Sequence, residues 1–272
     1  MNEGARDLND DRVAALLREA AGRMSPRGDP ARVVERTLAS STDRLFVVDS
    51  HLGELYVGAG SGGVRLVRRR GSAEGFTRDY RRRFGRLLAW SNDSRTRELA
   101  EEVARAVAGE EKARVPLDLS ETTPFGRRVL EVVGGIPRGE VRPYLWVARE
   151  AGSPGAARAV GTAMANNPVP LLVPCHRVIR NDGTTGDYAF GAEQKVRLLE
   201  MEGVPTQELA GTPYLATPTT GIFCHATCPN ARRIRPKNRR RFRTAAEAVE
   251  AGYRPCEVCR PVVVRWRREA AG

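Results

Sequence analysis

Residues 167–191 read NPVPLLVPCHRVIRNDGTTGDYAFG. This segment places Cys175 between a proline and a histidine, while the other four cysteines fall in the last fifth of the chain. A cysteine is a nucleophile only as a thiolate, so it needs a base or positive charge nearby and a group that orients the base. His176 is adjacent, and Glu202, at the end of the pattern GAEQKVRLLEME, is a candidate to hold its imidazole. These residues alone leave two interpretations open, a nucleophile with its base or a packed cysteine beside a surface histidine.

Three helical patterns precede this segment. The sequence TTPF at 122–125 gives a hydroxyl N-cap followed by proline at the first helical position, and the helix it starts ends near Gly134. Two further helices are predicted at 143–151 and 156–165, joined by a short glycine-containing turn in the manner of a helix-turn-helix. The last helix, AARAVGTAMA, offers small residues and a single Arg158, whereas a helix that reads base edges carries several polar side chains. Close approach to a nucleic-acid groove and tight packing in a core both remain open for it.

The first half of the chain carries few chemical groups. Residues 11–40 have helical spacing, and we assign no function to them. Three β-rich runs within 44–70, separated by turn residues, predict an antiparallel meander. Helical patterns follow at 74–84 and 95–108, the second ended by Gly109. This half is therefore expected to be a scaffold.

The charge of the chain is concentrated near its C-terminal end. The formal net charge is +12 over 272 residues, with a pI near 10.2. Residues 220–272 hold 13 Lys+Arg and 4 Asp+Glu, so 13 − 4 = +9 of this charge lies in a fifth of the chain. A cluster as dense as RRIRPKNRRR at 232–241 predicts a surface for nucleic acid or another phosphate.

The composition also indicates a compartment. No apolar run approaches the length needed to span a bilayer, and the first residues, MNEGARDLNDDR, are acidic and polar, unlike a signal peptide. We therefore expect a cytoplasmic protein with no membrane partner. In a reducing compartment, five cysteines are expected to be metal ligands or reactive thiols and not disulfides.

The segment around Cys175 closely resembles the active-site region of the O6-alkylguanine-DNA alkyltransferases. The resemblance runs from about Thr122 to Gly203 and includes, in order, GEVRPY, AARAVG, NPVP, PCHRV, the GDY loop and LLEMEG. It implies a single-turnover methylated-DNA–protein-cysteine S-methyltransferase, in which Cys175 irreversibly accepts the alkyl group from O6 of a damaged guanine. Residues that match the family's catalytic positions are His176, which acts on the cysteine through a water, Asn167, which orients the pair, and Glu202, which holds the histidine.

The same resemblance implies how DNA is bound. The target carbon lies inside the base stack, so the nucleotide must be flipped out. Arg158 matches the arginine that enters the space left behind, and its helix resembles the family's recognition helix in the minor groove. Tyr144 matches the tyrosine that supplies a proton to the guanine oxygen and lies close to the DNA phosphate. The further residues expected to contact DNA are Ala156, Gly161 and Tyr188.

Two positions depart from the family pattern. Ala189 stands where many relatives carry serine or another polar residue, which removes one hydrogen bond to the base. Phe190 stands where some relatives have glycine, and its bulk is expected to narrow the pocket. We therefore expect methyl groups to be transferred faster than benzyl groups.

The remaining cysteines form two close pairs with 27 residues between them, Cys224 with Cys228 and Cys256 with Cys259. Two such pairs predict one tetrahedral zinc ion with four cysteine ligands, whose simplest role is to fold this small segment. The stretches TTGIFCHATCPNARR and GYRPCEVCRP resemble the zinc module of the Ada-type methylphosphotriester repair proteins over residues 219–261.

This second resemblance implies that Cys224 is both a zinc ligand and a methyl acceptor. It also implies that the arginines within 232–243 and Arg254 hold flanking DNA phosphates.

The two resemblances imply an α+β chain of several domains. A helical extension at 1–40 is expected before a ribonuclease-H-like scaffold at 41–118 and a winged-helix-like alkyltransferase domain at 119–207. A linker at 208–218 and an Ada-type zinc domain at 219–272 follow. The expected partner is double-stranded DNA with alkylated guanine or methylated phosphate, bound by a monomer.

Two other functions stay open on the sequence. One is a methylation-switched, damage-sensing DNA-binding protein whose zinc module only clamps DNA. The other is a turnover hydrolase that uses Cys175 and His176 as its catalytic pair.

Overall fold

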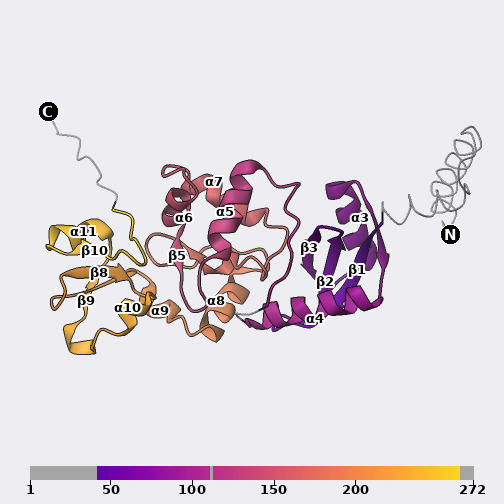
Figure 1. Cartoon of the computed structure of the whole chain (residues 1–272). Helices are drawn as coiled ribbons and strands as arrows, with labels where there is room; N and C mark the ends of the chain where they lie inside the picture. Colours follow the sequence, from indigo (N-terminus) through magenta and orange to yellow (C-terminus); the bar gives the residue numbers. More distant parts are fainter. Residues whose placement is uncertain (1–41, 111–112, 264–272) are drawn as a thin grey trace, which may run out of the picture.

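The structure, a computed structural model, describes residues 42–110 and 113–263. It has a mixed α/β fold with small sheets, in three parts that succeed one another along the chain (Figure 1). The helical extension expected at 1–40 lies outside the described residues. Within them, no helix has the length and apolar character needed to cross a membrane.

The first part is a four-stranded sheet with two helices. The meander is confirmed as strands β1, β2 and β3, and the order in the sheet is β3-β2-β1-β4. Strand β4 was not predicted, and it pairs parallel to β1 because the preceding helix α3 carries the chain back across the sheet. The bounds of these elements are β1 Thr42–Val48, β2 Leu55–Gly60, β3 Gly63–Arg69, α3 Ala73–Phe84, β4 Leu87–Trp90 and α4 Ser94–Ala108.

The second part is mainly helical. Its first helix, α5, begins as predicted, with Thr123 accepting a hydrogen bond from the backbone of Gly126 and proline in the first turn. Strands β5 and β6 form a short parallel pair beside the cysteine segment. The elements are α5 Pro124–Gly134, β5 Arg142–Pro143, α6 Tyr144–Glu150, α7 Ala157–Ala165, the 3₁₀ turn η1 Cys175–Arg177, β6 Val178–Ile179, α8 Ala192–Met201 and α9 Thr206–Leu209.

One apolar cluster joins the first two parts. It contains Val57 and Val64 from the sheet, Val129 and Val147 from α5 and α6, and the side chain of Cys175 itself. Burial of these side chains fixes the cysteine segment between the helices and the sheet. The first half of the chain therefore supports the site structurally.

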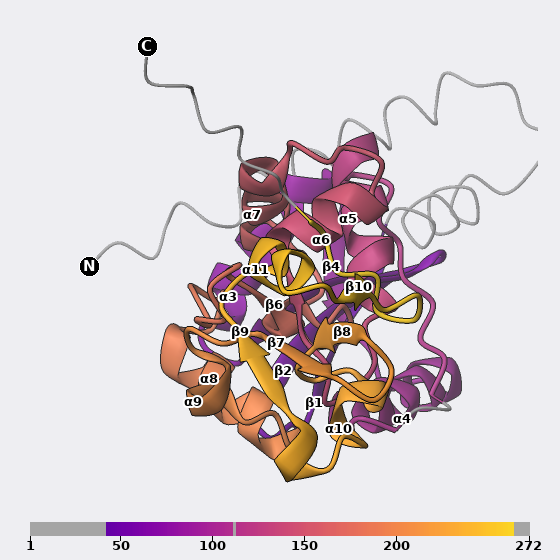
Figure 2. The same cartoon turned by 90° about the vertical axis from the view of Figure 1, so that its left-hand side faces the viewer.

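The third part is a small sheet with the order β10-β8-β7-β9. Figure 2, in which this part faces the viewer, shows it lying on one side of the second part. Its elements are β7 Tyr214–Thr217, β8 Ile222–His225, α10 Pro229–Arg232, the 3₁₀ turn η2 Pro236–Asn238, β9 Arg240–Phe242, α11 Ala245–Glu250 and β10 Arg254–Pro255.

The prediction of a linker at 208–218 is wrong. Residues 214–217 form β7, which pairs antiparallel with both β8 and β9 and is largely buried. The run YLAT is flanked on both sides by glycine, proline and threonine, which are typical of turns, so the sequence pattern did not predict a short strand there. The sheet of the third part therefore begins inside the segment that was expected to be a linker.

Candidate functional site

Cys175 lies at the floor of a cavity of ≈ 580 Å³. The cavity is bounded by α6, by α7 and by the loop that precedes α8. Its lining residues are Tyr144, Ala157, Arg158, Gly161, Met164, Ala165, Cys175, Arg180, Asn181, Gly186, Asp187, Tyr188 and Ala189. The structure thus brings the two predicted tyrosines and the predicted arginine together around the predicted cysteine.

Asn167 holds the cysteine segment in place. Its side-chain oxygen accepts a hydrogen bond from the Val169 amide at 3.0 Å. Its side-chain nitrogen donates to the Val173 carbonyl at 3.1 Å and to Cys175 Sγ at 3.2 Å. The loop between them bends at Leu171, whose φ of 74° lies in the left-handed region that a leucine rarely adopts. One buried amide therefore fixes both the loop and the sulfur.

The thiol of Cys175 is 4 % exposed. Burial raises its pKa, whereas the hydrogen bond from Asn167 and the positive charge of Lys195 act in the opposite direction. The burial effect is the larger one, so the resting group is a thiol. A base is therefore needed to form the thiolate.

His176 and Glu202 form the pair that the sequence predicted. His176 Nε2 lies 3.0 Å from Glu202 Oε1, and both side chains are buried. Burial would raise the pKa of Glu202, but hydrogen bonds from His176 and Arg177 outweigh it and lower this pKa to about 2. Burial lowers the pKa of His176, so the imidazole is neutral at pH 7. The ionised Glu202 carboxylate accepts a hydrogen bond from His176 Nε2–H, so the proton of the neutral ring is on Nε2 and the lone pair is on Nδ1.

Two cations near the site were not predicted as functional. Arg177 forms three hydrogen bonds to the Glu202 carboxylate, between 2.8 and 3.2 Å, and donates to the Ile136 carbonyl. Lys195 is fully buried, donates to the Val178 carbonyl at 2.6 Å and has a pKa lowered to about 8 by burial. A signal for Lys195 did exist, since it shares one helix face with apolar residues three and four positions later.

The two tyrosines at the cavity remain protonated at neutral pH. Burial, followed by the negative charges of the Cys175 thiolate and Asp187, raises the pKa of Tyr144. Burial also raises the pKa of Tyr188, whose ring packs edge-on against His176 with centroids 6.1 Å apart. Both phenols can therefore donate a hydrogen bond to a molecule in the cavity.

The small residues of α7 allowed two interpretations, close approach to a nucleic-acid groove and tight packing in a core, and the outer face of the helix distinguishes them. Arg158 is exposed at the cavity and Ala156 is the N-cap of the helix. A Cβ atom added to Gly161 would meet nothing within 4 Å, so no packing inside the protein requires glycine there. This favours close approach of an outside partner over tight core packing.

The expectation that Phe190 narrows the pocket is wrong. Phe190 does not line the cavity, and its ring lies edge-on against Tyr188 with centroids 5.5 Å apart. Ala189 does line the cavity. At this point the cavity is therefore bounded by Tyr188 and Ala189.

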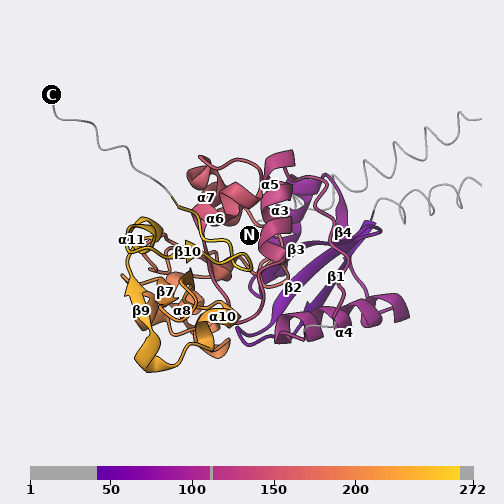
Figure 3. The same cartoon turned by 60° about the vertical axis from the view of Figure 1, so that its left-hand side comes forward.

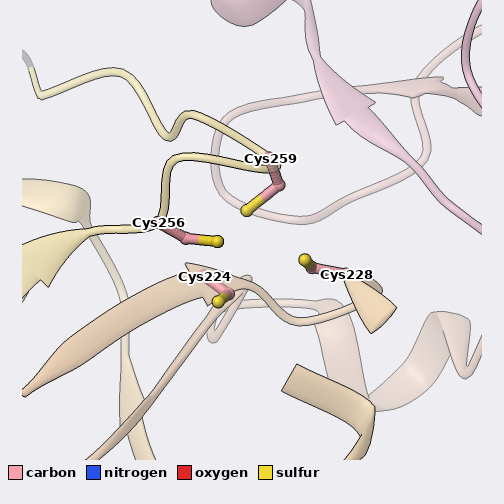
Figure 4. A group of neighbouring side chains, drawn as sticks. All are labelled: Cys224, Cys228, Cys256 and Cys259. Carbon is pink, nitrogen blue, oxygen red and sulfur yellow. The ribbon is translucent and has the colours of Figure 1, made fainter. Parts of the chain in front are cut away.

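The four remaining cysteines form one cluster. Their sulfur atoms all lie within 4.8 Å of one another, and all four side chains are buried (Figure 4). Cys224 lies in β8, Cys228 precedes α10, and Cys256 and Cys259 lie on the turn after β10. A tetrahedral zinc site with Zn–S bonds of about 2.3 Å separates the sulfurs by about 3.8 Å, so this donor set fits one zinc ion.

The basic residues of the third part divide into two groups. Arg254 is exposed, as expected for a phosphate contact. Other arginines make contacts within the protein. Arg232 donates to the Gly139 and Thr227 carbonyls. Arg239 donates to the Ile234 carbonyl, and Arg241 pairs with Glu208. The run at 232–243 is therefore partly structural, which sequence density alone does not reveal.

Family models match two consecutive parts of the chain. Residues 124–204 match the DNA binding domain of 6-O-methylguanine DNA methyltransferase. Residues 206–262 match the metal binding domain of Ada. The two matched ranges contain the Cys175 cavity and the cysteine cluster respectively.

Individual relatives match the same region. The chain is 52% identical over 88 residues to a methylated-DNA–protein-cysteine methyltransferase of Methanothermobacter thermautotrophicus, which covers 32% of this chain and 49% of that protein. A protein of the same name from Rattus norvegicus is 50% identical over 88 residues, which is 42% of its length. The chain thus spans about half the length of the curated relatives it matches. A crystal structure of Mycobacterium tuberculosis OGT in complex with DNA is 33% identical, with 62% of this chain and 98% of that chain covered and a TM-score of 0.47.

Proposed function

The chain belongs to the O6-methylguanine-DNA methyltransferase family and carries an Ada-type metal-binding domain, and we propose that it transfers alkyl groups from O6 of guanine in double-stranded DNA to Cys175. In this step the bond between the alkyl carbon and O6 breaks and a carbon–sulfur bond forms. The thioether that results is stable, so each molecule reacts once. The observation that carries the proposal is a buried thiol at a cavity, which accepts a hydrogen bond from Asn167 and is followed directly by a histidine paired with the buried Glu202.

The protonation states support His176 as the base. Its Nδ1 is buried and has no hydrogen-bond partner among the described residues, whereas Nε2 faces the ionised Glu202. Nδ1 therefore takes the thiol proton, through a bridging water molecule, and Glu202 stabilises the imidazolium that forms. Lys195 adds a positive charge close to the thiolate.

The leaving guanine needs a proton on the displaced oxygen. Tyr144 lines the cavity and stays protonated, so we assign it this donor role. Tyr188 is placed beside it to contact the flipped base. The base reaches the cavity only when it leaves the stack, and Arg158 is the residue proposed to occupy its place.

The recognition of DNA is assigned to α7. Its small residues, and above all the partly exposed Gly161, permit the backbone to approach a groove closely, and its lack of base-reading side chains suits repair at any sequence. We propose that the protein acts as a monomer on alkylated double-stranded DNA. Five unpaired cysteines fit a reducing compartment, such as the cytoplasm.

The domain assignments are part of the same proposal. A meander with a fourth, parallel strand supports a ribonuclease-H-like fold for the first part. Helices α5 to α7, with the pair β5–β6, support a winged-helix-like fold for the second. The proposed boundaries are 41–118 and 119–207, and the zinc domain begins at β7.

The cysteine cluster holds one zinc ion through its four sulfurs. Zinc keeps cysteine ligands deprotonated at neutral pH. We assign Cys224 as a second acceptor, whose sulfur takes a methyl group from a methylated phosphate and releases an ordinary phosphodiester. One observation favours the alternative, a zinc module that only clamps DNA, because Cys224 is 2 % exposed.

The proposal is tested by the stoichiometry of transfer. Duplex DNA with a radiolabelled methyl group on O6 of guanine is mixed with excess protein, and label on the protein is counted after digestion of the DNA. We expect at most one label per chain and none on the Cys175→Ser variant. Repeated turnover on a thioester or ester substrate would instead indicate a hydrolase.

A further inference from the structure

We propose that Trp146 is a positioning residue that ties α6, and with it Tyr144, to the turn carrying two of the zinc ligands. Zinc loading of the third part then sets the rate of alkyl transfer at Cys175. This inference rests on the proposed function of the Cys175 site. It concerns a contact between two parts of the chain that neither family model spans as a whole.

The contact consists of two hydrogen bonds and one ion pair. Trp146 Nε1 donates to the carbonyl of Cys259 at 2.9 Å, and Arg149 Nη2 donates to the carbonyl of Arg260 at 2.6 Å. The Arg260 side chain in turn pairs with Glu150. All three partners on the second part lie on α6, a helix of seven residues. Figures 1 and 3 both place the third part on the α6 side of the second part, away from the first sheet.

The turn that offers these carbonyls depends on the cysteine cluster. Cys256 and Cys259 bracket it, and the Arg260 amide donates to the Cys256 carbonyl at 2.8 Å. Arg260 has a φ of 42°, in the left-handed region that an arginine adopts only when its surroundings impose it. Ligation of both cysteines fixes this turn, whereas loss of the metal frees it. The positions of both acceptor carbonyls therefore follow the state of the cluster.

On the other side, Trp146 lies on the same helix as Tyr144, which lines the Cys175 cavity. It is two residues after Tyr144, the first residue of α6, and the N-cap Pro143 makes no side-chain hydrogen bond that would hold this end. The guanidinium of Arg142 lies over the Trp146 ring, 5.4 Å from its centroid. Arg142 is also paired in register with Val178, three residues after Cys175. A shift of the indole is thus expected to move Tyr144 through helix α6. It is expected to move the cysteine segment through Arg142 and the pair β5–β6.

Further contacts dock the third part against the segment that precedes β5. The Val141 amide donates to Thr227 Oγ1 at 3.0 Å, and Arg232 donates to the Gly139 carbonyl. The third part therefore contacts the chain both before β5, at 139–141, and after it, on α6.

The test compares Trp146→Phe with the unchanged protein, both loaded with zinc. Phenylalanine keeps an aromatic ring at this position but lacks the N–H donor. The rate of methyl transfer to Cys175 is measured over a range of duplex concentrations. We expect the maximal rate to fall about fivefold, as for loss of one hydrogen bond, and the DNA concentration at half-maximal rate to stay the same. Trp90→Phe, at a side chain that is 60% exposed, is the matched control and should leave both values unchanged.

A second measurement uses Trp146 as a reporter. In a Trp90→Phe, Trp266→Phe background, Trp146 is the only tryptophan, and chelation of zinc should shift its emission to longer wavelength and slow transfer by a similar factor. Equal maximal rates for Trp146→Phe, zinc-depleted and unchanged protein would overturn the inference. A protein that transfers no methyl group to Cys175 at all would instead contradict the proposed function.

Discussion

The two thiol sites of this chain prepare a cysteine for reaction in opposite ways. Cys175 is a single thiol whose pKa is raised by burial, and in the proposed mechanism a neutral His176, paired with an ionised Glu202, removes its proton. The cysteine cluster gathers four thiols within 4.8 Å of one another, where a metal ion supplies the positive charge. One site thus depends on neighbouring side chains and the other on zinc, so the two can be disabled separately.

The largest expected effects, on methyl transfer and on zinc content, come from replacing one cysteine of each thiol site in turn. Cys175→Ser should abolish transfer from O6-methylguanine while zinc content stays at one ion per chain. Cys256→Ser should lose zinc and keep transfer at Cys175, slowed by the looser contact with Trp146. Zinc is measured by atomic emission and transfer by label on the protein. Loss of zinc in Cys175→Ser would show that the sites are not separable.

Replacement of Glu202 should affect only the first site. Glu202→Gln removes the charge that stabilises the histidine imidazolium, and we expect transfer to Cys175 to slow by about 100-fold. Glu200→Gln, two residues earlier and exposed, is the control that should keep the full rate. Zinc content should not change in either variant. A rate within threefold of the unchanged protein would remove Glu202 and His176 from the mechanism.

Acid should destabilise the Cys175 site through the same carboxylate. The folded-state pKa of Glu202 is lowered to about 2 from an ordinary 4.5, so its stabilising effect is complete above about pH 5 and is lost as the pH falls toward 2. The shift corresponds to roughly 3 kcal/mol of unfolding free energy. Urea titrations at pH 7 and pH 3 should show a larger acid loss for the unchanged protein than for Glu202→Gln. Parallel losses in both proteins would contradict the assigned ion pair.

The smallest expected effect concerns the DNA face. Gly161→Ala meets open space in a helix, so it should raise stability by up to about 1 kcal/mol. The added methyl group should nevertheless weaken duplex binding, because it stands on the surface proposed to approach the groove. Gly134→Ala, at the end of α5 and also without neighbours within 4 Å, should leave binding unchanged. Thermal melts and fluorescence anisotropy with a labelled duplex measure the two quantities, and unchanged binding by Gly161→Ala would contradict the assignment of α7.

The sequence allowed the groups with local signals to be predicted. Cys175, His176 and Glu202 lie in consecutive motifs, and the spacing of the cysteine pairs predicted the cluster that the structure brings together. The caps at Thr123 and Gly109 likewise marked the helix ends correctly. These features are marked by short motifs and by residue types at fixed spacings, and they are therefore accessible without a structure.

Features that depend on distant contacts were missed. Strand β4 exists because it pairs with β1, and β7 because it lies between β8 and β9. The dense positive charge around Arg232 predicted a phosphate contact, whereas its guanidinium donates to the Gly139 carbonyl, 93 positions away. The bond between Trp146 and Cys259 spans 113 positions. No periodicity or turn signal encodes such pairings.

The central claim is tested most directly by peptide-resolved mass spectrometry of the zinc-loaded protein after incubation with DNA that carries both O6-methylguanine and methyl phosphotriesters. The account predicts one methyl group on Cys175 and a second on Cys224. A methyl group on Cys175 alone would reduce the third part to a zinc-stabilised DNA clamp. The absence of any methyl group on Cys175 would contradict the account.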